Sequence, residues 1–328
     1  MGMDTNSLRL LRSARTWIVT GACGYIGSHI VWQLIEFGQK VIGIDNLSSG
    51  FIERLHPKCI FLEGDIQDRT VLQKATGMEQ ISGIFNFAGL KYPEESFIRS
   101  EEYFRVNTGG VSSIIRFMTE NSINILVQSS SCSVYGETAA EKVSESAPLR
   151  PISPYGQSKL EAEILVRQQV QRGWLRATNL RYFNVAGALN SRLKDTSKHN
   201  LFPKLLKSTT ENGEATIYGN SYATDDGTCI RDYIHVEDLA LGHILAADRL
   251  LFSQLPSEIN LGGGRGFSVL EVIREFEKQL KIPISVKYGE ARRGDPSRIV
   301  ADIERARIYL DFSPRSTLSE MVKSTLAV

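Results

Sequence analysis

Short apolar runs alternate with longer amphipathic stretches from residue 16 onward. The runs are rich in Ile, Val, Leu and Phe, and we predict strands in TWIVT (16–20), KVIGID (40–45), CIFLEG (59–64), GIFNFA (83–88), INILVQSS (123–130) and LRATNLRYF (175–183). Strands that are apolar along nearly their whole length are typical of a parallel sheet buried on both faces. The intervening stretches predict helices near 26–38, 68–76, 95–120 and 154–172. This alternation predicts a doubly wound parallel α/β sheet.

The pattern changes after about residue 184. The polar segment ALNSRLKDTSKHN (188–200) predicts a loop, and the elements that follow it are shorter and mixed. We predict strands in EATIYG (214–219), RDYIHV (231–236), SEINLGGG (257–264) and ISVKY (284–288), and helices near 237–252 and 268–281. We therefore expect two domains, a doubly wound domain over residues 16–183 and a smaller mixed α/β domain over residues 184–328.

Composition excludes several classes of protein. The formal net charge is +1 and 23% of the residues are charged, without clusters of Lys and Arg, so we expect no nucleic-acid binding. No apolar run is long enough to span a bilayer, and MGMDTNSLRLLRSAR (1–15) lacks the apolar region of a signal peptide. A disordered tail fits this first segment better than a transit peptide, so we expect a cytoplasmic protein without membrane contact.

The cysteines and histidines do not suggest a metal site. The four cysteines lack C-x-x-C spacing, which argues against zinc and against a disulfide framework and fits a reducing cytosol; they are Cys23, Cys59, Cys132 and Cys229. The five histidines are too dispersed to form a ligand set; they are His29, His56, His199, His235 and His243. We expect no bound metal.

The stretch GACGYIGSH (21–29) follows the first predicted strand and opens a predicted helix. The spacing of Gly21, Gly24 and Gly27 is a variant of the dinucleotide-binding fingerprint. In that motif the first glycine permits a tight turn, the second lets a pyrophosphate approach, and the third lets the helix pack on the sheet, as in a Rossmann-type domain. For the triplet alone, a plain glycine-rich turn is an equally good interpretation.

Asp45 ends the second predicted strand, 24 residues after Gly21. A carboxylate at this place can accept hydrogen bonds from the adenosine ribose hydroxyls and repels a 2′-phosphate, which favours NAD over NADP. A solvated strand end is the alternative, and the glycines upstream favour the binding role.

The motif SPYGQSKLE (153–161) places Tyr155 and Lys159 four residues apart on one face of a predicted helix. A tyrosine is a weak base near neutral pH, and a nearby ammonium together with an oxidised nicotinamide would favour its phenolate and lower its pKa. This is the tuning that general-base catalysis needs. Upstream, VQSSSCSVYG (127–136) ends a predicted strand, and Ser131 there is placed to hydrogen-bond both a substrate hydroxyl and Tyr155.

Together these motifs resemble the extended short-chain dehydrogenase/reductases and, within them, the UDP-galactose 4-epimerases. The similar pieces span residues 18 to about 302 in the family's order: VTGACGYIGSH, DNLSSG, EGDI, FAGLK, SSSCSVYG, SPYGQSKL, LRYFNVAGA, YGNSYATDDGTCIRDYIHV, NLGGG and GDPSRIVAD. The resemblance implies that residues 16–183 bind NAD and residues 184–328 bind a nucleotide sugar.

The resemblance also implies roles for individual residues. In the NAD site, Tyr25 and Ile26 would contact the pyrophosphate, Asp45 and Asn46 the adenosine ribose, Asp65 and Ile66 the adenine, Phe87, Ala88, Gly89 and Lys91 the nicotinamide side, and Lys159 the nicotinamide ribose. In the substrate site, Asn184, Asn200 and Leu201 would touch the nucleotide sugar, Tyr218 the uracil, Arg231 and Arg292 the diphosphate, and Asp295 the uridine ribose. Lys91, Ser131, Tyr155 and Ile299 would also face the substrate.

Several of these residues have structural alternatives. Asn184 could cap a turn, Tyr218 could be a half-buried strand residue, and Arg231 could pair with Asp232 or Asp238 on a solvated face. The chain also departs from the family pattern at Tyr92-Pro93-Glu94 and in a short 188–199 loop, which weakens the match at Asn200.

The reaction implied is reversible inversion at C4 of a UDP-hexose through a transient 4-ketose, with NAD retained as a tightly bound cofactor. Ser131 and Tyr155 would move the proton. UDP-N-acetylhexosamines or UDP-pentoses are alternative substrates, and Ile299, in GDPSRIVAD, would tune the pocket at C2. A nucleotide-sugar dehydratase or decarboxylase ranks lower, because Cys132 and Ser133 stand where those relatives carry acidic residues. A non-catalytic NAD sensor is disfavoured, because Ser131, Tyr155 and Lys159 are all present.

Many relatives pair through the helices predicted near 95–120 and 154–172, so we expect a homodimer.

Overall fold

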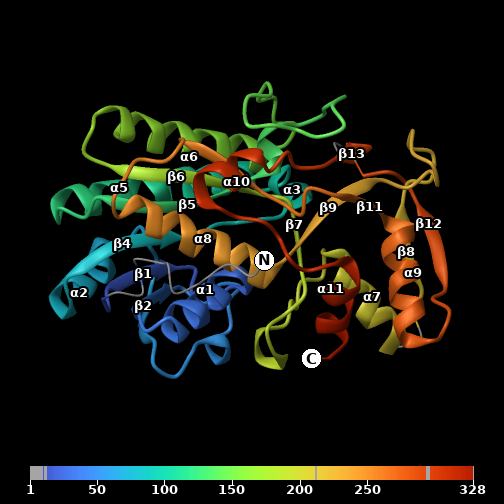
Figure 1. The fold of residues 1–328 in the computed structure, drawn as a ribbon, viewed down its shortest axis with the longest axis horizontal. Helices are drawn as coiled ribbons and strands as arrows, with labels where there is room; N and C mark the ends of the chain where they lie inside the picture. The colour runs from blue at the N-terminus through green and yellow to red at the C-terminus, as the bar shows by residue number, and fades with distance from the viewer. Residues whose placement is uncertain (1–9, 11–12, 211–212, 293–295, 328) are drawn as a thin grey trace.

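A seven-stranded parallel sheet lies at the centre of the larger part of the described chain (Figure 1). The structure is a computed structural model and describes residues 10, 13–210, 213–292 and 296–327. The strand order is β10-β6-β5-β4-β1-β2-β3. The bounds are β1 Thr16–Thr20, β2 Lys40–Asp45, β3 Ile60–Glu63, β4 Ile81–Asn86, β5 Ile125–Ser131, β6 Arg176–Tyr182 and β10 Glu258–Leu261. The predicted doubly wound parallel sheet is confirmed.

Helices cover both faces of this sheet, and each face has its own apolar core. On one face lie α1 (Tyr25–Glu36), α8 (Val236–Leu250) and α10 (Glu304–Leu310); on the other lie α2 (Arg69–Met78), α5 (Gly109–Glu120) and α6 (Pro154–Gln171) (Figure 1). The central strands are buried along their whole length, as their continuous apolar runs predicted.

Local signals fix several helix starts where the sequence placed them. Ser153 accepts a hydrogen bond from the Gly156 N–H at 3.1 Å and so caps α6, and Pro154 occupies its first turn. Asp68 caps α2 in the same manner. The observed bounds of α1, α2 and α6 therefore lie close to the predicted ranges.

The helix predicted over 95–120 is confirmed over residues 100–120 and is wrong only at its start. The chain forms α3 (Pro93–Ser96), α4 (Ser100–Tyr103) and a π-helical turn (Phe104–Thr108) before α5. The Asn107 side chain bonds both the N–H and the carbonyl of Leu90, which draws this turn onto the loop after β4. Gly109 and Gly110 follow, and a Cβ at Gly110 would lie 2.7 Å from Ile66 Cδ1. The helix widens into a π-helical turn, without a break, where it packs closely against two loops.

The second half of the chain builds smaller sheets. A four-stranded sheet contains β7 (Asn184–Ala186), β9 (Ile230–His235), β11 (Gly266–Ser268) and β13 (Arg298–Ile299), and β8 (Ala215–Tyr218) pairs with β12 (Val286–Gly289). They pack with α7 (Leu201–Thr210), α9 (Val269–Leu280) and α11 (Leu318–Leu326) around a separate apolar cluster. The sequence patterns did not indicate β7, β11, β13, α7, α10 or α11.

The expected boundary at residue 184 does not separate the two parts completely. After β9 the chain returns to the large sheet, where α8 covers one face and β10 pairs with β6. Hydrophobic periodicity indicates that a segment has a buried face, and it does not indicate against which sheet that face is buried. Residues of the second half of the chain, in α8 and β10, therefore belong structurally to the large sheet.

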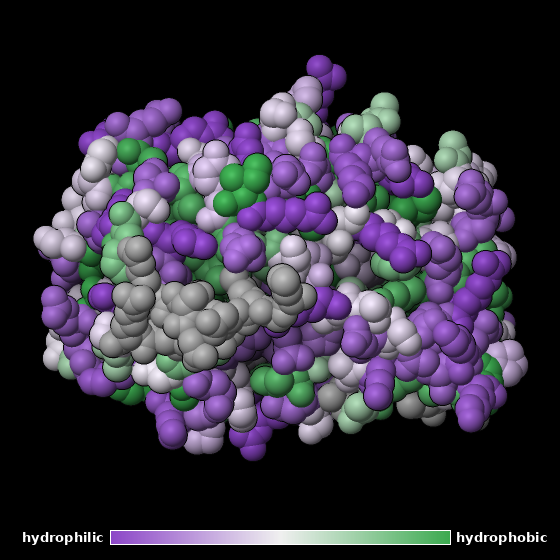
Figure 2. Space-filling view, viewed as in Figure 1, coloured by the Kyte–Doolittle hydropathy of each residue, from purple (hydrophilic) through white to green (hydrophobic). Residues whose placement is uncertain are grey.

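The surface carries no extended apolar region on the face in view. Outside the grey segments, Figure 2 shows a mainly hydrophilic face with hydrophobic residues scattered over it. Within the part of the chain that the structure describes, no helix combines the length and the apolar character needed to cross a membrane.

Candidate active site

The glycine-rich turn between β1 and α1 lies against the end of β4. Gly21 has a φ of +65°, and a Cβ there would lie 2.7 Å from the Ala88 backbone nitrogen. A Cβ on Gly27 would overlap the Gly21 carbonyl. The first and third glycines thus permit the tight turn and the close packing that the motif predicted.

The start of α1 fits a dinucleotide pyrophosphate. Among the described residues no side chain caps this helix, and its first turn holds no acidic residue, so its free N–H groups can bind an anion. A Cβ at Gly24 would meet Gly21 O at 3.1 Å, and no other described atom lies within 4 Å of it. The Tyr25 side chain points away and donates to Gly187 O at 2.5 Å. Tyr25 can therefore serve the predicted contact only through its backbone.

Residues predicted to hold the adenosine lie together beside this turn. Asp45 is only 8% exposed, which rules out the solvated strand end. Its carboxylate accepts from the N–H groups of Cys23 (2.9 Å) and Leu47 (2.8 Å). Burial raises the pKa of Asp45, and these two bonds act in the opposite direction. Asn46 donates to Asp65 at 3.2 Å, and Ile66 is buried behind them.

We expect Asp45→Asn to weaken NAD binding roughly tenfold or more and to reduce the preference for NAD over NADP. The variant keeps the shape of the side chain but loses the charge that would bond ribose hydroxyls and repel a 2′-phosphate. Dissociation constants for both dinucleotides, measured by titration of cofactor-free protein, test this. Asp68→Asn is the matched control, because Asp68 is an exposed acceptor at the start of α2. An unchanged ratio of the two constants would remove Asp45 from the cofactor site.

Ser131, Tyr155 and Lys159 converge at the carboxyl ends of β5 and β6. Ser131 ends β5; its Oγ donates to Ser133 Oγ at 3.1 Å, and its hydroxyl acts to lower the pKa of Tyr155. Lys159 lies one turn further along α6 and donates to the carbonyl and to Oγ of Ser129, both at 3.3 Å. All three predicted catalytic side chains are buried, with exposures between 7% and 9%. The structure therefore brings together the residues that the sequence singled out.

The protein surroundings shift the pKa values of these groups in opposite directions. Burial raises the pKa of Tyr155 to about 12, and the hydrogen bond from Ser131 counteracts this only in part. Burial lowers the pKa of Lys159 to about 8, against the attraction of Glu163. The protein surroundings alone raise the pKa of Tyr155 through desolvation, and the lowering expected beside a bound oxidised nicotinamide stays a prediction.

The residues predicted to line the nicotinamide side follow β4. Asn107, which the sequence analysis did not single out, holds their loop in place. A Cβ on Gly89 would lie 2.7 Å from Asn107 Oδ1 and 3.7 Å from Lys159 Nζ. Asn107 also donates to Ser158 Oγ at 2.9 Å, which ties the loop after β4 to α6. Phe87 and Ala88 precede Gly89, and Lys91 is exposed, with its Nζ 5.4 Å from the centre of the Tyr92 ring. The sequence offered no signal for Asn107, which looked like an ordinary residue inside a helix.

On the substrate side, Tyr218 and Arg292 form a stacked pair. The Arg292 guanidinium lies 4.1 Å from the centre of the Tyr218 ring, and its Nε lies 2.9 Å from Glu94 Oε1. The Tyr92 ring packs on His199 with centroids 4.3 Å apart. The segment that departs from the family pattern therefore reaches across to the second half of the chain. Asp295 lies outside the described residues.

The remaining predicted substrate residues lie around β9. Asn184 begins β7, and Ile299 is paired with Arg231 in the register of β13 and β9. Arg231 is 7% exposed, which rules out a solvated face, and the Asp232 carboxylate instead accepts three backbone N–H bonds. Ile299 is 4% exposed and packs in an apolar cluster with Val134, Tyr135, Val143, Phe183, Ala301 and Ile303.

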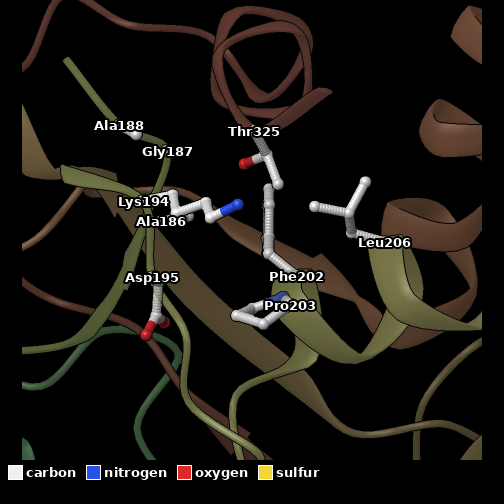
Figure 3. Close-up of a pocket in the computed structure, with 9 residues that line it drawn as sticks. All are labelled: Ala186, Gly187, Ala188, Lys194, Asp195, Phe202, Pro203, Leu206 and Thr325. Carbon is white, nitrogen blue, oxygen red and sulfur yellow. The ribbon is translucent and has the colours of Figure 1, made fainter. Parts of the chain in front are cut away.

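Asn200 and Leu201 lie at the start of α7, beside a small hollow. Asn200 donates to Asp195 at 2.7 Å. Figure 3 shows Lys194 and Phe202 directed into this hollow, with Thr325 from α11 above them. Ser131, Tyr155 and Lys159 are not among its lining residues.

Comparison with known proteins identifies the family. Residues 17–262 match the model of the NAD dependent epimerase/dehydratase family. The chain belongs to this family. Proteins named UDP-glucose 4-epimerase from Lactobacillus helveticus and Lacticaseibacillus casei are 36% and 38% identical to it, over 91% of this chain and 92% of each of theirs.

A solved structure agrees in fold. The UDP-glucose 4-epimerase of Stenotrophomonas maltophila, with bound NAD and formylated UDP-arabinopyranose, superimposes with a TM-score of 0.91. It is 32% identical, over 95% of this chain and 97% of that one. The family, the fold class and the NAD dependence inferred from the sequence are confirmed.

Proposed function

We propose that the chain catalyses reversible C4 epimerisation of a UDP-hexose, with UDP-galactose and UDP-glucose as the main pair and with Ser131, Tyr155 and Lys159 as catalytic residues. The observation that carries this proposal is the buried convergence of these three side chains next to the dinucleotide turn. The names of relatives that match over more than nine-tenths of their length support the same activity.

In the proposed mechanism Tyr155 accepts the proton of the C4 hydroxyl, and Ser131 holds that hydroxyl by a hydrogen bond. Lys159 holds the nicotinamide ribose and favours the Tyr155 phenolate by its charge. NAD would be held by the glycine-rich turn, Asp45 and Lys159, and would supply the reversible redox chemistry at C4 when bound. Arg231 and Arg292 hold the diphosphate while the 4-ketose turns its other face to the site. Tyr155 then returns the proton.

A dehydratase or decarboxylase fits the site less well. Elimination needs an acid or base after the position of Ser131, and Cys132 and Ser133 stand there. Burial raises the pKa of Cys132 to about 12, so its thiol stays protonated near neutral pH. The site therefore offers Tyr155 as its proton-transfer group and lacks a second one at this place among the described residues.

Incubation of the purified protein with UDP-galactose, with UDP-glucose assayed as product, tests the proposal. We expect turnover without added stoichiometric NAD, because the cofactor is regenerated in every cycle. NADH that accumulates in proportion to product would indicate a dehydrogenase, and a 4-keto-6-deoxy or decarboxylated product would indicate the alternative class. Either result would contradict the epimerase assignment.

Ile299 is proposed to limit the space at C2 of the sugar. We expect weaker turnover of the N-acetylhexosamines than of the simple hexoses, and Ile299→Tyr should suppress the N-acetyl reaction further. A misfit of about one methylene changes recognition by roughly 1–3 kcal/mol, which biases a pocket without closing it. The ratio of kcat/KM for the two substrate pairs, in the wild type and in Ile299→Tyr, measures this effect. Ile303→Tyr, in the same apolar cluster, controls for general crowding. An unchanged ratio in Ile299→Tyr would make Ile299 a packing residue.

We also propose a cytoplasmic homodimer that pairs through α6 and the segment before α5. Ile98 is 87% exposed and Ile164, on α6, is 38% exposed, so this face offers apolar surface to a second copy. Cys23, Cys59 and Cys132 are free thiols, which suits a reducing compartment. Light scattering at micromolar concentration should give twice the monomer mass, and a monomer mass would contradict the dimer.

A further inference from the structure

Residues 92–95 follow the loop after β4 and reach the substrate side of the molecule. The Tyr92 ring packs on His199 with centroids 4.3 Å apart. Glu94 Oε1 lies 2.9 Å from Nε of Arg292, one of the two proposed diphosphate ligands. The sequence departs from the family pattern at both Tyr92 and Glu94. None of the proposed catalytic steps uses Glu94, although its carboxylate faces a residue that those steps need.

The backbone of this segment is anchored, whereas the side chain of Glu94 is free to rotate. The Tyr103 hydroxyl accepts from the Tyr92 N–H at 3.0 Å and lies 2.7 Å from Glu95 Oε2. Pro93 has a fixed φ and begins α3. The Glu94 side chain, in contrast, is 52% exposed. It can therefore turn into water without any movement of the backbone that carries it.

Glu94 neutralises Arg292 without satisfying its donors. The Nε atom of Arg292 is buried and has no hydrogen-bond partner among the described residues, so the 2.9 Å contact is an ion pair in which the N–H is not directed at the carboxylate. A guanidinium carries its N–H donors in a rigid fork, which matches the oxygens of a phosphate. The Arg292 guanidinium also stacks on the Tyr218 ring, 4.1 Å from its centre, which limits its movement.

A second cation lies at the same ring. Lys204, on α7, has its Nζ 5.1 Å from the centre of the Tyr218 ring. Two positive charges and the carboxylate of Glu94 therefore gather around Tyr218. The diphosphate of a UDP-sugar carries a negative charge on each phosphate, so it balances two cations better than a single carboxylate does.

We infer that Glu94 competes with the diphosphate of the UDP-sugar for Arg292 and thereby weakens the binding of substrate and product. The inference rests on the proposed function, in which Arg292 holds the diphosphate. Binding of the UDP-sugar must first separate Glu94 from Arg292, and the freed carboxylate then stays near the phosphates as a like charge. UDP-galactose and UDP-glucose carry the same diphosphate, so the penalty is equal for both. Glu94 therefore sets how readily the product leaves, without changing the reaction equilibrium.

Titration of the NAD-loaded protein with UDP, followed by calorimetry, measures this competition without turnover. Glu94→Gln keeps the size of the side chain and removes its charge. We expect the dissociation constant of UDP to fall about two- to fivefold, the range that an exposed ion pair can contribute. The difference should shrink as the ionic strength is raised, because salt screens exposed charges. The KM for UDP-galactose should fall as well.

Glu120→Gln is the matched control. It removes the same charge from another exposed ion pair, in which Glu120 on α5 lies 3.1 Å from Arg69 on α2. The dissociation constant of UDP should stay at the wild-type value in this variant. A decrease as large as that in Glu94→Gln would show that the net charge of the protein determines the affinity, and the inference would then be wrong.

A double variant tests whether the effect passes through Arg292. Arg292→Met alone should weaken UDP binding, because a contact with the phosphates is lost. In that background Glu94→Gln should change the dissociation constant much less than it does in the wild type. An equal gain in both backgrounds would overturn the inference, because Glu94 would then repel the ligand without acting on Arg292. Unchanged or weaker binding in Glu94→Gln itself would also overturn it, since a carboxylate that orients Arg292 for the diphosphate predicts weaker binding.

The proposed function has a separate test. Wild-type protein that fails to convert UDP-galactose would contradict the epimerase assignment, whatever the UDP titrations give. Wild-type protein that converts UDP-galactose, together with a Glu94→Gln variant that binds UDP no more tightly, would contradict the role of Glu94 alone. The two failures are therefore distinguishable.

Discussion

Replacing Tyr155 by Phe should reduce turnover of UDP-galactose by about 10²–10⁴-fold, the usual contribution of a general base. The variant keeps the ring, which packs edge-to-face with Tyr103 at a centroid distance of 6.2 Å, and removes the ionisable hydroxyl. NAD should stay bound, because the dinucleotide turn and Asp45 are untouched. Initial rates with UDP-galactose and the NAD content of the purified variant give the two measurements.

The pH dependence of the wild type provides an independent check on the same residue. The reactive form of Tyr155 is the phenolate, and burial holds its pKa near 12 in the protein itself, so activity should rise with pH until the base is ionised. Tyr135→Phe controls for the loss of a buried hydroxyl outside the site. If Tyr155→Phe keeps near wild-type turnover, another group must be the base, and the mechanism proposed above is wrong.

The strands and the catalytic motif were predictable because their signals are local. TWIVT and KVIGID are continuous apolar runs, and the observed β1 and β2 have the same bounds as predicted. Tyr155 and Lys159 share a helix, and one helical turn determines their relative placement. Ser131 was predictable because it ends a parallel strand, where the ligands of such sheets bind.

Features that depend on contacts between distant segments were not predictable from one sequence. The helix expected over 95–120 contains a π-helical turn where Asn107 bonds Leu90, and the sequence around these two residues gives no sign of this contact. The Glu94–Arg292 pair joins the two halves of the chain, and the stretch around Glu94 was recognisable only as a departure from the family pattern. The raised pKa of Tyr155 likewise reflects burial, which the spacing of charges along a helix does not show.

The largest effect on stability is expected from disruption of the buried ion pair that joins α6 to β6. Arg181 on β6 binds Glu163 through two hydrogen bonds of 2.9 and 2.7 Å, and the two side chains are 1% and 0% exposed. Ser130 adds a third bond to the carboxylate at 2.6 Å. Glu163→Ala leaves the guanidinium buried without its counter-charge, and this should lower the free energy of unfolding by about 3–5 kcal/mol.

Urea unfolding at a fixed, saturating NAD concentration measures this loss, with the NAD dissociation constant of each variant measured beside it, because bound NAD adds a stabilisation that depends on that constant. Glu79→Ala, which removes the exposed partner of Lys40, is the control and should change stability little. In the double variant Glu163→Leu with Arg181→Met, apolar side chains replace both charges, and most of the lost stability should return. That recovery would show that Glu163→Ala loses stability because the buried charge of Arg181 is left without a partner. A double variant as unstable as Glu163→Ala would mean that the pair is needed for packing between α6 and β6, and the electrostatic account would then fail.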